Sequence, residues 1–197
     1  MSDVLGARIV PPRDRKSIRK DTYKLREILG LKNELYFPIM QFLESCLPLL
    51  DTDFHIEVVK DNLLPGRMAE TIPDQHLIRI KESVYNGACL DHPWARKVMA
   101  HELGHYLYHD SAKIAYAHPQ RGEQFPKQFN PEYQAEVFAS ELLAPINLIK
   151  GQHPRWIAQK CGVPYGTAEG QLVQVAHTQK ERKKKKAAKH KSKTARQ

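Results

Sequence analysis

The chain has 197 residues and carries 31 Lys and Arg against 22 Asp and Glu, a formal net charge of +9. Ten of these bases and one of the acids lie in residues 180–197, so residues 1–179 carry no net charge. That balance excludes a protein that is basic over its whole length, and a hydrophobic content of 41% excludes wholesale disorder. We expect one folded domain with an appendage.

The sequence predicts a cytoplasmic protein. It has no run of about 18 apolar residues that could cross a membrane, and residues 1–20 lack the apolar core of a secretory signal. The three cysteines, Cys46, Cys89 and Cys161, are odd in number and share no CxxC spacing. This pattern is typical of reduced thiols and signals no cysteine-based zinc site.

The N-terminal residues predict an arm and two helices. Residues 1–13 are mixed in character and rich in Pro and Arg, so we expect a flexible arm. Apolar residues then recur at helical spacing over residues 14–31 and again over residues 35–50. Pro38 would lie in the first turn of the second helix.

The apolar pattern then changes to a period of two. Residues 54–58 alternate apolar and polar side chains, which predicts a half-buried strand. Two more short strands, residues 68–72 and 76–80, flank Pro73-Asp74-Gln75, a plausible hairpin turn. We expect these strands to form a small antiparallel sheet.

Two longer helices follow, each opened by a capping residue and a proline. The first begins at Asp91 or His92, before Pro93, and ends near His109. The second begins at Asn130-Pro131 and ends at Pro145. The residues between them, 110–130, are polar and contain two prolines, so they predict a long loop.

The C-terminal residues predict a helical unit and a tail. Residues 151–179 have the outline of a helix-turn-helix, with few bases in the second helix, so we expect packing or partner binding rather than DNA reading. Residues 180–197 predict a disordered tail rich in Lys and Arg. Such a tail could contact nucleic acid without sequence preference, and the alternative is a tail that only adds solubility.

The strongest chemical signal is the run His101-Glu102-Leu103-Gly104-His105. Residues four apart lie on one face of a helix, so both imidazoles could reach one zinc ion at roughly 2.0–2.1 Å. Glu102 could then take a proton from water at the metal. Gly104 weakens a helix by roughly 1 kcal/mol relative to Ala, which is tolerable where another backbone or a substrate packs closely. The alternative is an ordinary helix that carries two histidines.

A catalytic zinc site usually has three protein ligands. Glu132, at the start of the next predicted helix, is the strongest candidate for the third. Glu136 lies one turn further on the same face, where it could accept a hydrogen bond from the other nitrogen of a ligand histidine. Glu141, Glu123 and Asp110 are weaker candidates for the ligand. The alternatives are an acid that complements the helix dipole at Glu132 and a solvent-facing side chain at Glu136.

These motifs resemble the ImmA/IrrE-type zinc metallopeptidases of bacteria, phages and mobile elements. That family reads roughly AHELGHxxLH and then ExEAnxFAxxLLmP. The resemblance covers about residues 15–148 and rests on four runs: Ala100–His105, Tyr108–Asp110, Glu132–Ala139 and Leu142–Pro145. Gln134 stands where an acid is frequent, Glu136 where Asn is common and Ala144 where Met is common. None of these departures removes a required ligand.

The resemblance implies an α+β, mostly helical, zincin-like domain over residues 14–150, of the gluzincin kind. Helices would surround a small antiparallel sheet whose edge can align a peptide. It implies a zinc-dependent endopeptidase, with one zinc per chain, that cleaves or inactivates a repressor-like regulatory protein. In that reaction Glu102 would assist the attack of zinc-bound water on a peptide bond.

Other functions remain open from the sequence. The chain could be a protease-like module that recognises a repressor or nucleic acid without hydrolysis, or a toxin of a two-gene toxin–antitoxin pair. An intact Glu102 argues against pure binding, which has no use for a general base. The group that would stabilise the oxyanion is undecided between four residues: Tyr106, Tyr116, His118 and Arg121.

Overall fold

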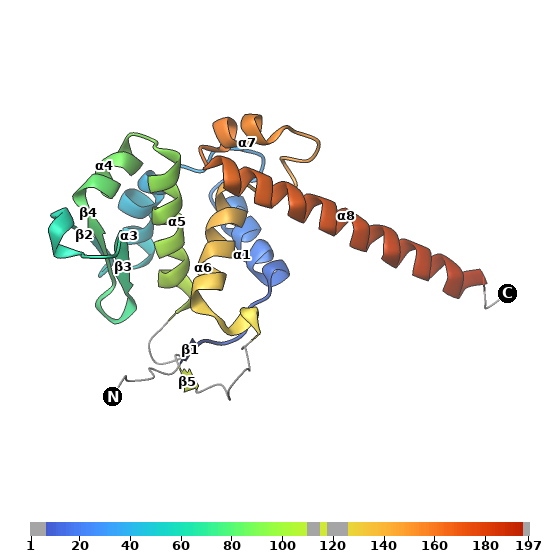
Figure 1. The fold of residues 1–197 in the computed structure, drawn as a ribbon, viewed down its shortest axis with the longest axis horizontal. Coiled ribbons are helices and arrows are strands. Elements are labelled where there is room, and N and C mark those ends of the chain that lie inside the picture. Colours follow the sequence, from blue (N-terminus) through green and yellow to red (C-terminus); the bar gives the residue numbers. More distant parts are fainter. Residues whose placement is uncertain (1–6, 110–114, 118–125, 195–197) are drawn as a thin grey trace.

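The computed structural model of the protein describes residues 7–109, 115–117 and 126–194. Helices make up most of these residues, and the strands form two small, separate sheets (Figure 1). The fold is therefore α+β, as the sequence predicts. At its centre lie two neighbouring helices, α5 over Pro93–Tyr108 and α6 over Pro131–Leu143, which contribute much of the buried core.

Two helical segments form the N-terminal part. Helix α1 spans Arg15–Ile28, and the Asp14 side chain caps it by accepting a hydrogen bond from the Ser17 backbone N–H. The second segment consists of helix α2 (Ile39–Gln41), the π-helical turn η1 (Phe42–Cys46) and helix α3 (Leu47–Leu50). It begins later than predicted, because a proline disfavours helical backbone in the residue before it and Pro38 therefore excludes residues 35–37.

A three-stranded sheet packs against α5. Its strands are β2 (His55–Val59), β3 (Ala69–Ile72) and β4 (Leu77–Lys81), in the order β2-β4-β3, with 3₁₀ turns over Asp61–Leu63 and Pro73–Gln75. Strands β3 and β4 form the predicted antiparallel hairpin. The expectation of a wholly antiparallel sheet is wrong, because β2 pairs with β4 in parallel. The chain crosses to the other side of β4 after β2, so β3 is left as an edge strand.

The N-terminal arm is partly ordered, contrary to the expectation for residues 1–13. Strand β1 (Ala7–Ile9) pairs antiparallel with β5 (Ala115–Ala117), and the Val10 N–H donates to the Phe129 carbonyl at 3.0 Å. These backbone hydrogen bonds hold the arm against the segment before α6, which includes a 3₁₀ turn over Lys127–Phe129. Residues 1–6, and most of the predicted loop over 110–130, lie outside the described residues.

The C-terminal part is a helix-turn-helix with a long second helix. Helix α7 spans Pro154–Cys161, Gly162 turns the chain in the left-handed region (φ 62°), and helix α8 spans Tyr165–Thr194. The sequence predicted that the helical unit ends at residue 179 and that the chain is disordered from residue 180. Instead α8 continues through the basic residues, which contain only good or moderate helix formers and no Gly or Pro after Gly170.

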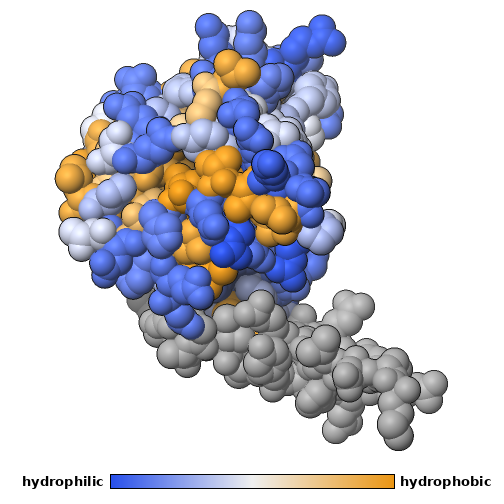
Figure 2. All heavy atoms as spheres, turned by 90° about the vertical axis from the view of Figure 1, so that its left-hand side faces the viewer, coloured by the Kyte–Doolittle hydropathy of each residue, from blue (hydrophilic) through white to orange (hydrophobic). Residues whose placement is uncertain are grey.

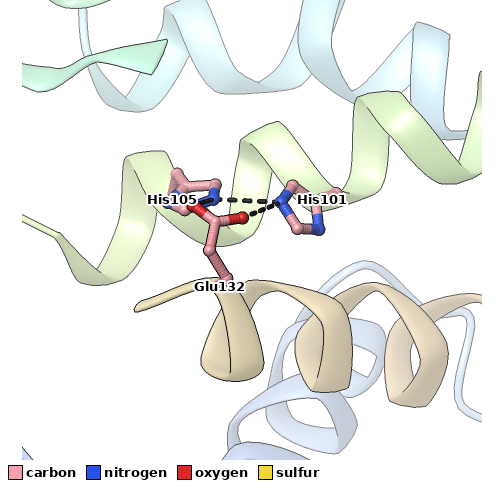
Figure 3. A group of neighbouring side chains, drawn as sticks. All are labelled: His101, His105 and Glu132. Carbon is pink, nitrogen blue, oxygen red and sulfur yellow. Dashed lines mark hydrogen bonds and ion pairs between the residues drawn. The ribbon is translucent and has the colours of Figure 1, made fainter. Parts of the chain in front are cut away.

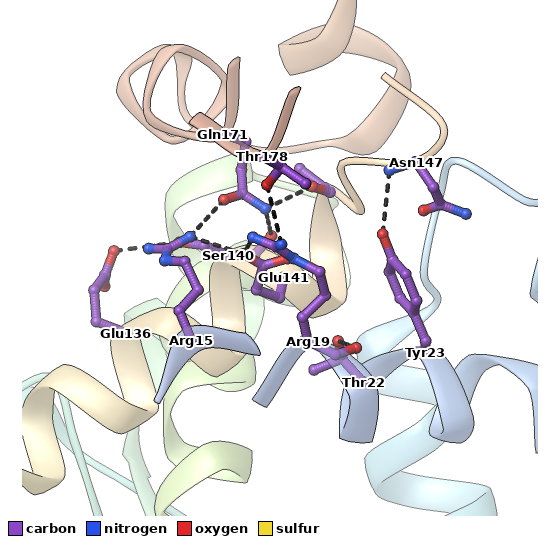
Figure 4. Close-up of polar contacts among 11 residues, drawn as sticks. Arg15, Arg19, Thr22, Tyr23, Glu136, Ser140, Glu141, Asn147, Gln171 and Thr178 are labelled. Atoms are coloured by element: carbon purple, nitrogen blue, oxygen red, sulfur yellow. Dashed lines mark hydrogen bonds and ion pairs between the residues drawn. The ribbon is translucent and has the colours of Figure 1, made fainter. Parts of the chain in front are cut away.

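A buried ion cluster attaches α8 to α1 and α6 (Figure 4). The Glu141 carboxylate is fully buried and accepts from Arg15 at 2.8 Å and from Arg19 at 2.8 and 3.0 Å. Gln171 of α8 accepts from Arg15 at 2.9 Å and donates to the carbonyls of Ser140 and Ala144, at the C-terminal end of α6. Because each polar group in the cluster has a partner, the first turns of α8 are held firmly on the body.

The outer face of the sheet region carries apolar side chains among polar ones (Figure 2). Helix α4 (Glu82–Cys89) lies on the same side of the molecule in Figure 1. The large exposed apolar residues on the neighbouring elements are Leu49, Leu50, Val58 and Leu63. Among the described residues, no helix combines the length and apolar character needed to cross a membrane, since long α8 is polar.

Candidate metal centre

Helices α5 and α6 bring three potential ligands together (Figure 3). His101 and His105 lie one turn apart on α5, with their Nε2 atoms 3.0 Å from each other. Glu132 lies in the first turn of α6, which Asn130 caps by accepting a hydrogen bond from the Tyr133 N–H. Its Oε2 is 3.2 Å from Nε2 of His101, and its Oε1 is 3.5 Å from Nε2 of His105.

This donor set fits a tetrahedral zinc ion. Ligand atoms that each lie about 2.0–2.1 Å from a tetrahedral zinc are about 3.3 Å from one another. The three separations here, 3.0, 3.2 and 3.5 Å, scatter around that value. Two imidazole nitrogens and one carboxylate are also a ligand combination that zinc prefers in catalytic sites. The three residues therefore form a group that could hold the metal.

Close packing of α5 on α6 makes this approach possible. A Cβ atom on Gly104 would stand 3.1 Å from the Cα of Ala135 and 3.2 Å from the Phe138 side chain. Contacts this short are rare for real Cβ atoms, so only glycine fits here without some displacement. The sequence left open whether a backbone or a substrate packs closely on Gly104; a backbone does, and it belongs to the helix that carries Glu132.

The charges of the group reinforce one another. The hydrogen bond from His101, together with the neighbouring imidazole of His105, holds the pKa of the Glu132 carboxyl well below its usual range. For His101, burial acts to lower the pKa, but the Glu132 hydrogen bond and the nearby carboxylates outweigh it and raise the pKa above its ordinary value. Glu132 is thus an anion at neutral pH, as a ligand must be.

Glu102 lies beside this group and is held from the sheet. Its side chain is buried, and the Thr71 hydroxyl donates to its carboxylate at 2.6 Å while lying 3.1 Å from its backbone carbonyl. Thr71 belongs to the edge strand β3. The sequence analysis did not single out Thr71, because only the packing of β3 on α5 brings it to Glu102.

Glu136 lies near the histidines without a hydrogen bond to them. Its Oε2 is 3.9 Å from Nδ1 of His101, which is longer than a hydrogen bond. Its Oε1 instead forms an ion pair with Lys97 at 2.7 Å. The side chain is therefore in position to influence His101 by its charge, and its expected role as a hydrogen-bond acceptor for that residue stays a prediction.

A second pair of residues behind His105 was missed by the sequence analysis. His109 continues the row of histidines, and its Nδ1 lies 2.8 Å from Nδ1 of His105. Its Nε2 lies 3.2 Å from Oε1 of Gln134, a fully buried residue on α6. The four-residue spacing of His101, His105 and His109 was the available signal, since residues at that spacing share one face of a helix.

The hydrogen bonds of this pair define which nitrogen of His105 is free. The Gln134 amide donates to the carbonyls of Pro11 at 2.9 Å and Gln128 at 2.7 Å, so its oxygen must accept from Nε2–H of His109. Nδ1 of His109 then accepts from Nδ1–H of His105. This leaves Nε2 of His105 with its lone pair directed at His101 and Glu132, as a metal ligand requires.

A pocket of about 740 Å³ opens over the group. One wall is the edge strand β3 with the residues before it, and the opposite wall is α6. The floor is α5, which also contributes the exposed side chain of Trp94, and the first turn of α8 closes one end with Thr167. An open edge strand, an apolar side chain and a metal-ligand group therefore face the same space.

A comparison with known protein families identifies the family of this chain. A peptidase family described as the IrrE N-terminal-like domain matches residues 58–172, which include β3, β4, α5, α6 and α7. The match extends over more than half of the chain. The chain belongs to the IrrE N-terminal-like domain family. It is therefore a protein of a metallopeptidase family, as the resemblance predicted.

The fold of this IrrE N-terminal-like chain is also found among solved structures. It is similar to a Mycobacterium tuberculosis transcriptional regulator, with a TM-score of 0.50 and 13% sequence identity. The match covers 78% of this chain but 45% of the regulator, so the chain spans less than half of that protein's length. At this identity the likeness shows a shared fold. No curated protein sequence matches the chain.

Within the described residues, the structure does not bring the other candidates, for the third ligand or for the oxyanion-stabilising group, to this site. Glu141 is occupied in the buried ion cluster with Arg15 and Arg19. The Tyr106 hydroxyl, considered for the oxyanion, hydrogen-bonds to Asp51, and it does not line the pocket. Among the other candidates, Tyr116 lies in β5 but its side chain is outside the description. The remaining four candidates lie outside the described residues: Asp110, His118, Arg121 and Glu123.

Proposed function

We propose that the protein is a zinc-dependent endopeptidase. The observation that carries this proposal is that the Nε2 atoms of His101 and His105 lie 3.0 Å apart and each lies 3.2–3.5 Å from an oxygen of the Glu132 carboxylate, close to the ligand separations around tetrahedral zinc. When bound there, zinc would polarise the scissile carbonyl and lower the pKa of water. The family to which the chain belongs supports this chemistry.

The residues of the chain would supply the proton transfers. Glu102 takes a proton from the attacking water and gives it to the leaving amine as the peptide bond breaks. Thr71 keeps the Glu102 carboxylate oriented by its hydrogen bond. His109 and Gln134 keep Nε2 of His105 unprotonated, and Glu136 adds negative charge beside His101.

The shape of the pocket favours an extended peptide as substrate. Among the described residues, strand β3 pairs with β4 alone, so its other edge can offer backbone groups to an incoming strand. A peptide bound along that edge would cross the pocket above Glu102 and the metal ligands. Met68 and Trp94, both largely exposed in the pocket, would contact an apolar side chain of that peptide.

The substrate we infer is a specific regulatory protein of repressor type. This follows from the resemblance of the motifs to regulatory metallopeptidases and from the family match. A substrate of this kind would present an exposed, extendable segment to the β3 edge. The alternative of a binding module without hydrolysis is less favoured, because a buried carboxylate oriented by Thr71 has a use in proton transfer and none in passive recognition.

Elemental analysis of the purified protein tests the metal centre first. We expect about one zinc per chain in the wild type and loss of zinc in His105→Ala and Glu132→Ala. Glu169→Ala, which removes an exposed acid from α8, is the matched control and keeps its zinc. Zinc retained at full occupancy in Glu132→Ala would mean that the third ligand lies elsewhere.

The catalytic role is tested separately with Glu102→Gln. We expect this variant to keep its zinc while cleavage of a random-sequence peptide mixture falls by about 10²–10⁴-fold. Mass spectrometry of the mixture detects the products and the cleaved bonds. Zinc binding without any cleavage by the wild type would instead support the binding module.

A further inference from the structure

The second half of α8 is a cationic rod. Its residues 180–194, which we call the basic half, hold nine Lys and Arg and one acid, Glu181, within about 22 Å of helix. Successive residues turn by about 100° around a helix, so the run 182–186 alone places a Lys or Arg side chain on every side. The described side chains, 180–188, are all exposed.

The basic half lacks a partner within the part of the chain that the structure describes. Over side chains 180–188, the one ion pair joins Glu181 to His177, at 3.8 Å. Bases four residues apart, such as Lys180 and Lys184 or Arg182 and Lys186, repel each other along the helix. A polyanion would remove this repulsion and so stabilise the helical conformation.

The body holds this helix in a fixed direction. Gln171 is bonded to the end of α6, and Thr178 accepts from Arg19 at 3.3 Å, two residues before the basic half begins. Beyond that point α8 extends away from all other elements (Figure 1). Its first turn, at Thr167, lines the pocket. One helix therefore connects the metal centre to the basic half, and Lys183 lies about 24 Å along it from Thr167.

The chemistry of the basic half selects nucleic acid among polyanions. Its only apolar residues are Ala187 and Ala188, so it has no apolar face to insert into a lipid surface. A helix with side chains is about 10–12 Å wide and the major groove of B-DNA about 12 Å, with phosphates along both margins. Lys and Arg side chains on all sides of one helix match that distribution of phosphates.

We propose that the basic half of α8 binds the phosphates of a nucleic-acid duplex without reading its sequence. Lysines dominate it, and they contact phosphates as point charges rather than recognise base edges in pairs of hydrogen bonds. This inference does not depend on the proposed peptidase activity. If the proposed function also holds, a regulatory protein bound to the same duplex would be brought within a few tens of ångströms of the pocket.

Fluorescence anisotropy with the full chain and a labelled random-sequence duplex tests the proposal. With about five phosphates contacted, the affinity should fall by roughly 10²–10³-fold between about 50 and 200 mM salt. Substituting Gln for the Arg and the four Lys of residues 182–186 should abolish most of this salt dependence. It should also weaken binding at low salt by at least about 100-fold. These side chains are exposed, so the variant should unfold at the wild-type temperature.

A charge-matched control separates the basic half from overall charge. It substitutes Gln at five exposed lysines of the body: Lys16, Lys20, Lys60, Lys127 and Lys150. The proposal requires that this control bind the duplex as the wild type does. Equal weakening of both variants, or wild-type binding by the variant at 182–186, would overturn it.

Two further readouts distinguish the remaining outcomes. Binding to vesicles that contain phosphatidylserine, without binding to the duplex, would assign the basic half to membranes and overturn the proposal. Zinc content is measured in the same samples, and we expect it to be unchanged in both variants. Failure of the nucleic-acid proposal is then visible independently of the metal centre.

Discussion

A Cβ atom on Gly104 would stand 3.1 Å from the Cα of Ala135, so the two helices that carry the candidate metal ligands touch at a glycine. We predict that Gly104→Ala forces α6 away from α5 and moves Glu132 from the histidines. The strain, about 1–3 kcal/mol, is partly offset by the gain of roughly 1 kcal/mol in helix propensity. Zinc affinity should therefore fall more clearly than the stability of the metal-free protein, as measured by chelator competition and thermal unfolding.

Gly170→Ala is the control for that experiment. Gly170 lies in α8 with nothing within 4 Å of an added Cβ. Here the substitution should stabilise the protein by about 0.5–1 kcal/mol and leave zinc affinity unchanged. Equal zinc affinity in Gly104→Ala and the wild type would show that the close contact does not position Glu132.

We predict that the hydrogen bonds behind His105 support metal binding. His109→Phe keeps the ring but removes the acceptor for Nδ1–H of His105, so zinc affinity should fall by about 10–100-fold. Gln134→Glu keeps an acceptor for His109 but loses the amide donors to Pro11 and Gln128, so zinc affinity should fall less than in His109→Phe while the metal-free protein is less stable. Chelator competition measures both variants, and thermal unfolding of the metal-free proteins checks that each remains folded.

The opposite order of affinities would contradict the proposed direction of these hydrogen bonds. If Gln134→Glu weakened zinc as much as His109→Phe, the oxygen of Gln134 would not be the group that matters. The bonds from the Gln134 amide to Pro11 and Gln128 would then be the more important contribution.

Burial of His109 predicts a loss of stability in acid. Burial, aided by the neighbouring His105, lowers the pKa of His109 to about 4, whereas an unfolded histidine titrates near 6.5. Between these values the unfolded state binds the extra proton, so this contribution is complete above about pH 6.5 and is lost as the pH falls towards 4. Its full size is roughly 3 kcal/mol.

Urea unfolding of the metal-free protein at about pH 4.5 and pH 7 measures this effect. The difference in unfolding free energy between the two pH values should be smaller in His109→Phe than in the wild type, because the variant lacks the titrating group. Identical pH dependence in the two proteins would mean that His109 is not the residue that takes up the proton.

The ion cluster around Glu141 should contribute strongly to stability. Glu141→Ala leaves the guanidinium groups of Arg15 and Arg19 without their buried partner, at a cost of about 3–5 kcal/mol. Urea unfolding gives this value, and limited proteolysis should show earlier cleavage within α8. Glu27→Ala, which removes an exposed ion-pair partner of Lys32, should change stability far less, because solvent screens that pair.

Local signals in the sequence predicted most helices and the placement of His101 and His105 on one helix face. Asp14 and Asn130 are capping residues whose side chains need no distant partner, so they mark helix starts directly. The spacing of His101 and His105 is likewise a property of one helix. Where the prediction used local chemistry alone, as at the α6 start, the structure agrees with it.

Contacts made by distant segments could not be predicted in this way. The parallel pairing of β2 with β4 depends on the path of the chain between strands, and alternation does not encode strand direction. Thr71 and Gln134 have no motif of their own and matter because of what they contact after folding. The helical basic half was missed because its composition was interpreted as disorder, although lysine and alanine favour helices.

The hydrogen bonds from Gln134 to Pro11 and Gln128 make the N-terminal arm a thermodynamic partner of the metal centre. Coupling between two sites is reciprocal, so zinc held by His105 should tighten the arm by the same factor by which an ordered arm tightens zinc. A molecule that binds the segment around Pro11 would then weaken or strengthen zinc binding allosterically. It would do so without entering the pocket.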